Sequence, residues 1–78
     1  MLSVEQIKAA RMLLGWDQAE LAAKAGLSPG TVKRLEAKPG IIGGTMDTVV
    51  RLKSALEHAG VEFIGNPQEG PGVRLWNR

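Results

Sequence analysis

The chain has 78 residues, a length that fits one domain, and its 44% hydrophobic and 23% charged residues are typical of an ordinary soluble globular protein. It contains no cysteine, which excludes a disulfide framework and a thiolate metal site. The net charge is only +2, but residues 1–40 hold six Lys and Arg against four Asp and Glu, whereas residues 41–78 hold four of each. The excess of positive charge in the first half indicates a polyanionic partner.

Targeting and catalytic signals are missing from the sequence. No apolar run approaches the roughly 20 residues that span a bilayer, and Glu5 and Gln6 interrupt the N-terminal stretch where a signal peptide would need an apolar core. We therefore expect a cytoplasmic, bacterial-type protein with no membrane partner. No nucleophile–base pair or carboxylate dyad is visible, so we expect no enzymatic activity. His58, the single histidine, has no ligand partners at a suitable spacing, and we expect no metal and no cofactor.

Helix starts and stops predict four helices in the first 60 residues. A capping residue marks each start. Three of these residues are followed by Gln, Glu or Pro at a favourable position, namely Ser3 with Gln6, Asp17 with Glu20 and Ser28 with Pro29, and Thr45 can cap the fourth helix. Glycines mark three of the stops: Gly15, Gly26 and Gly60. In the third helix, residues 28–37, Val32 and Leu35 form a narrow apolar stripe. The stripe expected on the fourth helix is longer: Met46, Val49, Leu52, Leu56 and Ala59.

Residues 61–64 and 72–76 alternate between apolar and polar side chains, which predicts two short strands that pair antiparallel. Val61 and Phe63 share one face, and Trp76 falls on the face opposite Val73 and Leu75. Because an isolated hairpin is marginal in water, it must pack on the helices or on another chain. We expect residues 1–60 to form the helical domain and residues 61–78 to be part of the same compact unit or a dimer interface.

The second and third predicted helices have the spacing of a helix-turn-helix. Ala22 is small where the two helices would cross, Gly26 can adopt the positive φ of a tight turn, and Val32 and Leu35 fill the angle between the helices. Each feature is common alone. Their combination at these separations is fairly specific.

On the stretch QAELAAKAGLSPGTVKRLE (18–36), the chain resembles the Cro- and lambda-repressor-like helix-turn-helix family, also called the XRE family, over roughly residues 4–60. The resemblance implies a mainly α, four-helix DNA-binding domain, here with a short C-terminal pair of strands. It implies a sequence-specific transcriptional regulator whose third helix lies in the major groove of double-stranded DNA while the second crosses the backbone. The residues expected at the DNA are Gln18, Ser28, Gly30, Thr31, Lys33, Arg34 and Lys38.

The residues support the same placement of the third helix. If Val32 and Leu35 face the core, the opposite face carries Lys33 and Arg34, either of which can reach a guanine edge or a phosphate. Pro29 and Gly30 depart from the family, whose members often have polar side chains there. Base discrimination is therefore expected to rest on Lys33, Arg34 and Thr31, or on DNA shape.

The loop before the fourth helix has two interpretations. Gly43, Gly44 and Thr45 precede a helix N-terminus that could hold a DNA phosphate, with Lys38 alongside, or they could simply form the helix entry. A nucleotide-binding P-loop is not expected, because its lysine spacing and its preceding strand are missing.

Arg11 and Glu36 both fall on apolar helix faces. Because unpaired buried charges are very costly, we expect the two to form a structural ion pair, as the resembling family often does, and we exclude Arg11 from the DNA contacts. Trp16 is expected to plug the core between the first two helices.

The function predicted from the sequence is a dimeric repressor that binds a two-fold symmetric operator. The apolar residues left for a homodimer interface are Val50, Phe63, Ile64, Leu75 and Trp76. The alternative is an antitoxin or another interaction module, whose C-terminal strands bind a toxin or another protein partner.

Overall fold

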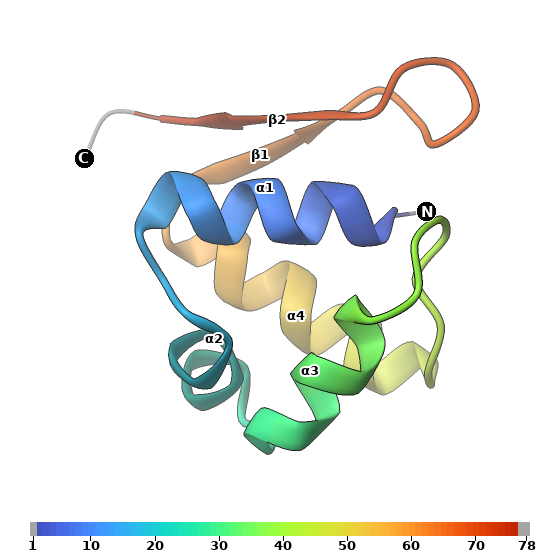
Figure 1. The fold of residues 1–78 in the computed structure, drawn as a ribbon. Coiled ribbons are helices and arrows are strands. Elements are labelled where there is room, and N and C mark those ends of the chain that lie inside the picture. Colours follow the sequence, from blue (N-terminus) through green and yellow to red (C-terminus); the bar gives the residue numbers. More distant parts are fainter. Residues whose placement is uncertain (1, 77–78) are drawn as a thin grey trace.

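The computed structural model describes residues 2–76, which form four helices followed by a β-hairpin (Figure 1). In chain order the elements are α1 (Val4–Leu14), α2 (Gln18–Ala25), α3 (Pro29–Glu36), α4 (Met46–His58), β1 (Val61–Ile64) and β2 (Gly72–Leu75). The mainly α fold with a C-terminal strand pair, predicted from the sequence, is confirmed. Residues 77 and 78, which the prediction included in the tail, lie outside the described residues.

Capping side chains begin all four helices, as predicted. Ser3 and Gln6 form a complete capping box at α1, in which the Gln6 N–H donates to Ser3 Oγ and the Ser3 N–H donates to Gln6 Oε1. The side chains of Asp17, Ser28 and Thr45 each accept from a backbone N–H three residues further on. Helix starts are local features, which explains why the sequence located them well.

The core lies where the four helices meet beneath the hairpin. Its largest fully buried side chains are Val4, Ile7, Leu21, Val32, Leu52 and Leu56. Ala22, 0% exposed, packs among them where α2 approaches its neighbours. Burial of such a side chain stabilises the fold by about 1.5–3 kcal/mol.

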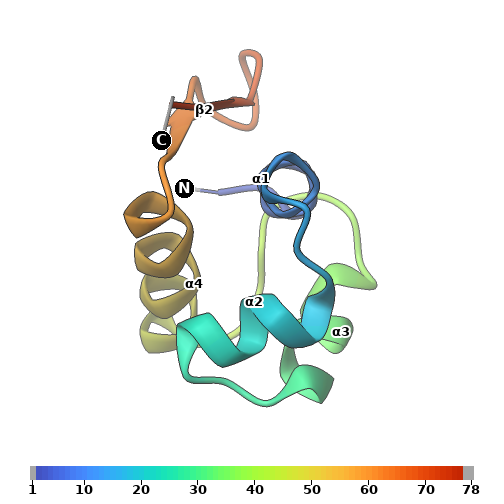
Figure 2. The same cartoon turned by 90° about the vertical axis from the view of Figure 1, so that its left-hand side faces the viewer.

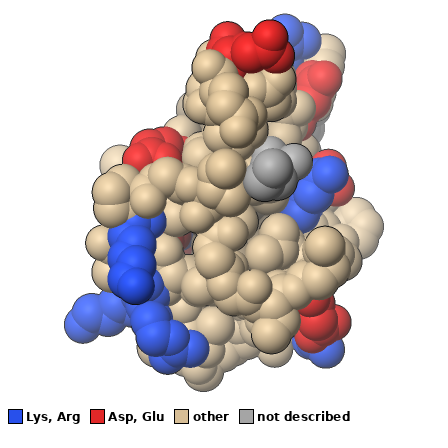
Figure 3. Space-filling model, turned by 90° about the vertical axis from the view of Figure 1, so that its right-hand side faces the viewer, with Lys and Arg blue, Asp and Glu red and all other residues tan. Residues whose placement is uncertain are grey.

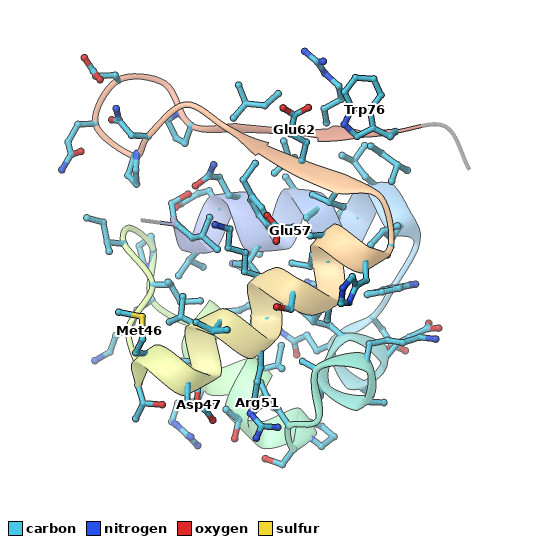
Figure 4. The ribbon with its side chains drawn as sticks, turned by 180° about the vertical axis from the view of Figure 1, so that it is seen from behind. Met46, Asp47, Arg51, Glu57, Glu62 and Trp76 are labelled. Carbon is cyan, nitrogen blue, oxygen red and sulfur yellow. The ribbon has the colours of Figure 1, made fainter. Side chains whose placement is uncertain are left out.

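The stripe predicted for α4 was wrong at one residue. Leu52 and Leu56 are buried, but Met46 is 78% exposed at the first position of the helix (Figure 4). The chain enters α4 from an exposed glycine loop, so no element covers the first turn on the side of Met46. Trp16, expected in the core, is half-buried, and it packs against the core cluster at the end of α1.

The hairpin packs across α1 and α4 with an antiparallel register that pairs Val61 with Leu75 and Phe63 with Val73 (Figures 1 and 2). This register puts all four apolar side chains on the inner face, where they pack on the helical core. Gln6 holds the loop end of the hairpin to α1. Its Nε2 donates to the carbonyl oxygens of Ile64 at 3.3 Å and Gly72 at 3.0 Å.

A short backbone connection, which the sequence analysis missed, holds the segment after α3. Ser3 and Ile41 form an isolated antiparallel bridge, the Val4 N–H donates to the Gly40 oxygen at 2.7 Å, and the Ile42 N–H donates to the Leu2 oxygen at 3.0 Å. The loop that leaves α3 is thereby tied to the start of α1. Among the described residues, no helix combines the length and the apolar character needed to cross a membrane.

Candidate nucleic-acid interface

α2 and α3 meet through a tight turn with the geometry of a helix-turn-helix (Figure 2). Gly26 ends α2 with φ +71°, and the next residue returns a hydrogen bond, Leu27 N–H to the Ala22 oxygen, at 2.8 Å. A Cβ on Gly26 would lie 3.1 Å from Nη1 of Arg51, which reaches over the turn from α4. Glycine therefore suits the positive φ of this turn, and it leaves room for the Arg51 guanidinium.

The orientation of α3 against α1 is held by a buried ion pair. The Arg11 guanidinium donates twice to Glu36, from Nε to Oε2 at 3.0 Å and from Nη2 to Oε1 at 2.9 Å. Only 2% of the Glu36 side chain and 14% of the Arg11 side chain are exposed, so the pair is largely shielded from solvent. Arg11 also donates from Nη1 to the Trp16 oxygen at 3.0 Å, which connects the pair to the α1–α2 linker.

Gln18, expected at the DNA, belongs to the same cluster. Its Nε2 donates to Glu36 Oε1 at 2.9 Å, which links the first residue of α2 to the last residue of α3. This bond was not predicted from the sequence. One signal could have suggested it. A buried carboxylate needs several donors, and Gln18 is the one amide side chain on the second predicted helix.

The face of α3 turned away from the core carries Pro29, Gly30, Lys33, Arg34 and Ala37, all of them exposed. The opposite side holds the buried Val32 and Glu36. This division follows the helical period, and it puts two long cations in the middle of the free face and no bulky side chain at its start.

The hydroxyl groups in the first turn of α3 bond to each other. Ser28 Oγ accepts from the Thr31 N–H at 3.3 Å and lies 2.9 Å from Thr31 Oγ1. One of the two hydroxyl protons is used in that contact, so this turn has less capacity for outside partners than its composition suggests.

Positive charge gathers along the side of the molecule that α3 occupies. In Figure 3, Lys and Arg side chains form a band down the lower left edge of the molecule, with acidic groups above it, at the top and along the right edge. Lys33, Arg34 and Lys38 are all exposed, and none of them forms an ion pair with a described residue. Such a band of uncompensated cations is the electrostatic footprint of a polyanion site.

The glycine loop before α4 is exposed at residues 43–45. Thr45 uses its side chain as the helix cap, accepting from the Thr48 N–H at 3.2 Å. Gly44 has φ +88°, and a Cβ there would lie 3.2 Å from Leu35 Cδ2. The helix-entry interpretation accounts for Gly44 and Thr45, and a phosphate contact at Gly43 stays a prediction.

The five residues predicted for a dimer interface separate into two groups. Val50, Ile64 and Trp76 are 51%, 37% and 54% exposed, whereas Phe63 and Leu75 are partly buried against the core. Trp76 lies on the outer side of the hairpin, where its Nε1 donates to Glu62 Oε1 at 3.0 Å (Figure 4).

A hollow of about 530 Å³ adjoins this surface. Its lining includes Ile41, Met46, Val50 and Phe63. Among the described residues that line it, Lys53 alone is charged. Within residues 2–76, no set of three His, Asp or Glu side chains is placed to hold a metal ion.

Comparison with protein families agrees with this geometry. The family model described as Helix-turn-helix matches residues 7–46, a range that runs from α1 through α2 and α3 to the first residue of α4. The match therefore includes the ion pair, the turn and the whole cationic face of α3. No curated protein gives a significant match to the chain.

Proposed function

We propose that this chain, which belongs to the Cro- and lambda-repressor-like helix-turn-helix family, is a dimeric repressor that reads the major groove with α3. The family is one of DNA-binding, non-enzymatic domains, and the chain is a DNA-binding regulator of the XRE kind. The observation that carries the proposal is the free face of α3. It is narrow at its start and cationic in its middle, and it is held rigidly by the Arg11–Glu36 pair.

Lys33 and Arg34 are assigned to the bases or the adjacent phosphates. Both are exposed, and both project from the second turn of an eight-residue helix that fits a major groove about 12 Å wide. Ser28, Thr31 and Lys38 flank them and are assigned to the backbone of the DNA.

Gln18 has a second role in this assignment. One amide proton is bound to Glu36, and the other is free for a phosphate.

A homodimer fits the size of the protein. The molecule is 29 Å across its longest axes, and successive major grooves on one side of DNA are about 34 Å apart, so two bound copies would stand nearly in contact. Val50, Ile64 and Trp76 supply exposed apolar surface for that contact. Two half-sites read together would also compensate for the few base-reading side chains on one α3.

The alternative partner is a different protein, such as a toxin, seated on the same apolar surface around Val50, Ile64 and Trp76. It is compatible with DNA binding. Mass measurement of the protein purified from its native host separates the two, because a homodimer gives twice the mass of the chain and a toxin complex gives a second species.

The DNA assignment is tested with the double variant Lys33→Ala/Arg34→Ala. Each lost bidentate base contact costs about 1–3 kcal/mol, so we expect the loss of two contacts to weaken operator binding at least about thirtyfold. Measurement is by fluorescence anisotropy on a DNA selected from a random pool, with circular dichroism to verify the helical content.

The matched control is Lys8→Ala/Lys53→Ala, which removes the same net charge from exposed positions on α1 and α4. It should bind within about threefold of the parent protein, because neither residue lies on α2 or α3 and exposed charges separated by more than about 10 Å are largely screened at 0.1 M salt. If both double variants lose operator affinity equally, the assignment of α3 to the major groove is wrong.

A further inference from the structure

The first turn of α3 contains a glycine that nothing inside the protein requires. Gly30 is not among the residues with positive φ, and a Cβ built on it meets no atom within 4 Å. Glycine is a poor helix former, so a residue with a side chain would suit α3 better. An external surface that comes close to the backbone at this position would account for the missing side chain.

The same turn offers one free donor beside one apolar ring. The N–H of Gly30 has no acceptor among the described residues, as is usual for the first N–H groups of a helix. Pro29, exposed at the first helical position, has no N–H and presents only its ring. Pro29 and Gly30 therefore combine an apolar contact with a neighbouring backbone donor.

Among the base edges of the major groove, thymine matches this combination. Its edge has the O4 acceptor next to the C5-methyl group, whereas guanine has two acceptors and no methyl, and cytosine and adenine each present an amino donor. In helix-turn-helix complexes, the N-terminal residues of the recognition helix contact the base edges.

We propose that Pro29 and Gly30 read a thymine in each half-site, with the Pro29 ring against the C5-methyl and the Gly30 N–H donating to O4. This inference rests on the proposed function, because it assumes that α3 enters the major groove. Recognition at this end of α3 then needs no polar side chain. Lys33 and Arg34 read the positions one helical turn further along.

The experiment replaces single thymines of the selected operator by deoxyuridine, which keeps O4 and base pairing but removes the methyl group. Burial of one methyl contributes a factor of about four, so we expect about fourfold weaker binding when the thymine of one half-site is replaced and about sixteenfold when the thymines of both half-sites are replaced. In the variant Pro29→Ala, the same deoxyuridine substitutions should change the affinity less than twofold, because the ring that contacts the methyl is missing.

The control variant is Pro71→Ala, an exposed proline outside α3, which should retain the full deoxyuridine effect. In a further variant, Gly30→Ala, the protein should melt at an equal or higher temperature and bind the operator at least about tenfold more weakly, because the added methyl group blocks the close approach.

Three results would overturn the inference while leaving DNA binding intact. They are an operator without thymine in its half-sites, full affinity with deoxyuridine at every thymine, and an unchanged deoxyuridine effect in Pro29→Ala. If the random pool yields no preferred sequence at all, the proposed function itself fails, and the inference fails with it.

Discussion

Glu36 is the side chain on which the orientation of α3 most directly depends. Its carboxylate accepts three hydrogen bonds, two from Arg11 and one from Gln18, while the residue is only 3% exposed. Such a buried charge is costly unless an opposite charge and enough hydrogen-bond donors compensate it. The cluster thus joins α1, α2 and α3 at one point directly behind the cationic face.

At this scale we predict that Arg11→Met destabilises the protein by about 3–5 kcal/mol, because it leaves the Glu36 carboxylate buried without its cation. For a domain of this size, that loss lowers the melting temperature by roughly 15 °C or more. Thermal unfolding followed by circular dichroism measures it.

The matched control for that variant is Lys53→Met, which removes an exposed partner of Glu57 at 4.0 Å and should change the melting temperature by only a few degrees. An unchanged melting temperature in Arg11→Met would argue against a structural role for the pair.

Among the elements, the hairpin depends most on contacts distant in sequence. Gln6 Nε2 bonds the carbonyl oxygens of Ile64 and Gly72, which are 58 and 66 residues away along the chain. The inner face of the hairpin also packs on the helical core. We infer from these contacts that the hairpin folds with the helices as one unit.

This inference predicts the effect of Gln6→Glu. A glutamate keeps the capping box with Ser3, but it loses both donated bonds and puts a negative charge against two carbonyl oxygens. We expect a loss of about 2–3 kcal/mol, or roughly 10 °C in melting temperature. Faster amide exchange in residues 61–64 and 72–75 should accompany it.

Gln68→Glu, the same change at an exposed position in the hairpin loop, is the control and should melt with the parent protein. If Gln6→Glu melts like Gln68→Glu, the hairpin is not held to α1 by this side chain.

For the whole molecule, the central proposal is that two copies act together. A dimer that neutralises phosphates with Lys33, Arg34 and Lys38 of each copy would release about six counterions, so the logarithm of its affinity should fall with the logarithm of salt concentration with a slope of about −5. A monomer that uses the same residues would give about half that slope.

The proposed dimer surface is tested by the double variant Ile64→Ser/Trp76→Ser. We expect this variant to sediment as a monomer and to show the smaller salt slope, because exposed apolar area is removed from the proposed interface. Met12→Ser, which replaces one apolar residue that is 71% exposed on α1, should leave both measurements unchanged. If sedimentation shows that only one copy of the parent protein binds an operator with two half-sites, the dimer is contradicted.

Much of the fold and of the candidate site was predictable, since the signals for both are local. The caps at Ser3 and Ser28 and the turn at Gly26 depend on residues three or four positions apart. The exposed face of α3 follows from the helical period once Val32 is assigned to the core. The pairing of Arg11 with Glu36 was predicted too, because a buried charge requires an opposite one.

The sequence by itself thus determined the elements, the helix-turn-helix and the side of α3 that carries Lys33 and Arg34. Only the tertiary structure decided that Met46 lies exposed, that Gln18 donates to Glu36, and that Gln6 holds the hairpin. It also revealed that a side chain on Gly30 would meet no atom of the protein. The physical reason is distance along the chain, because a local pattern carries no information on which distant group returns to cover or to bond a given side chain.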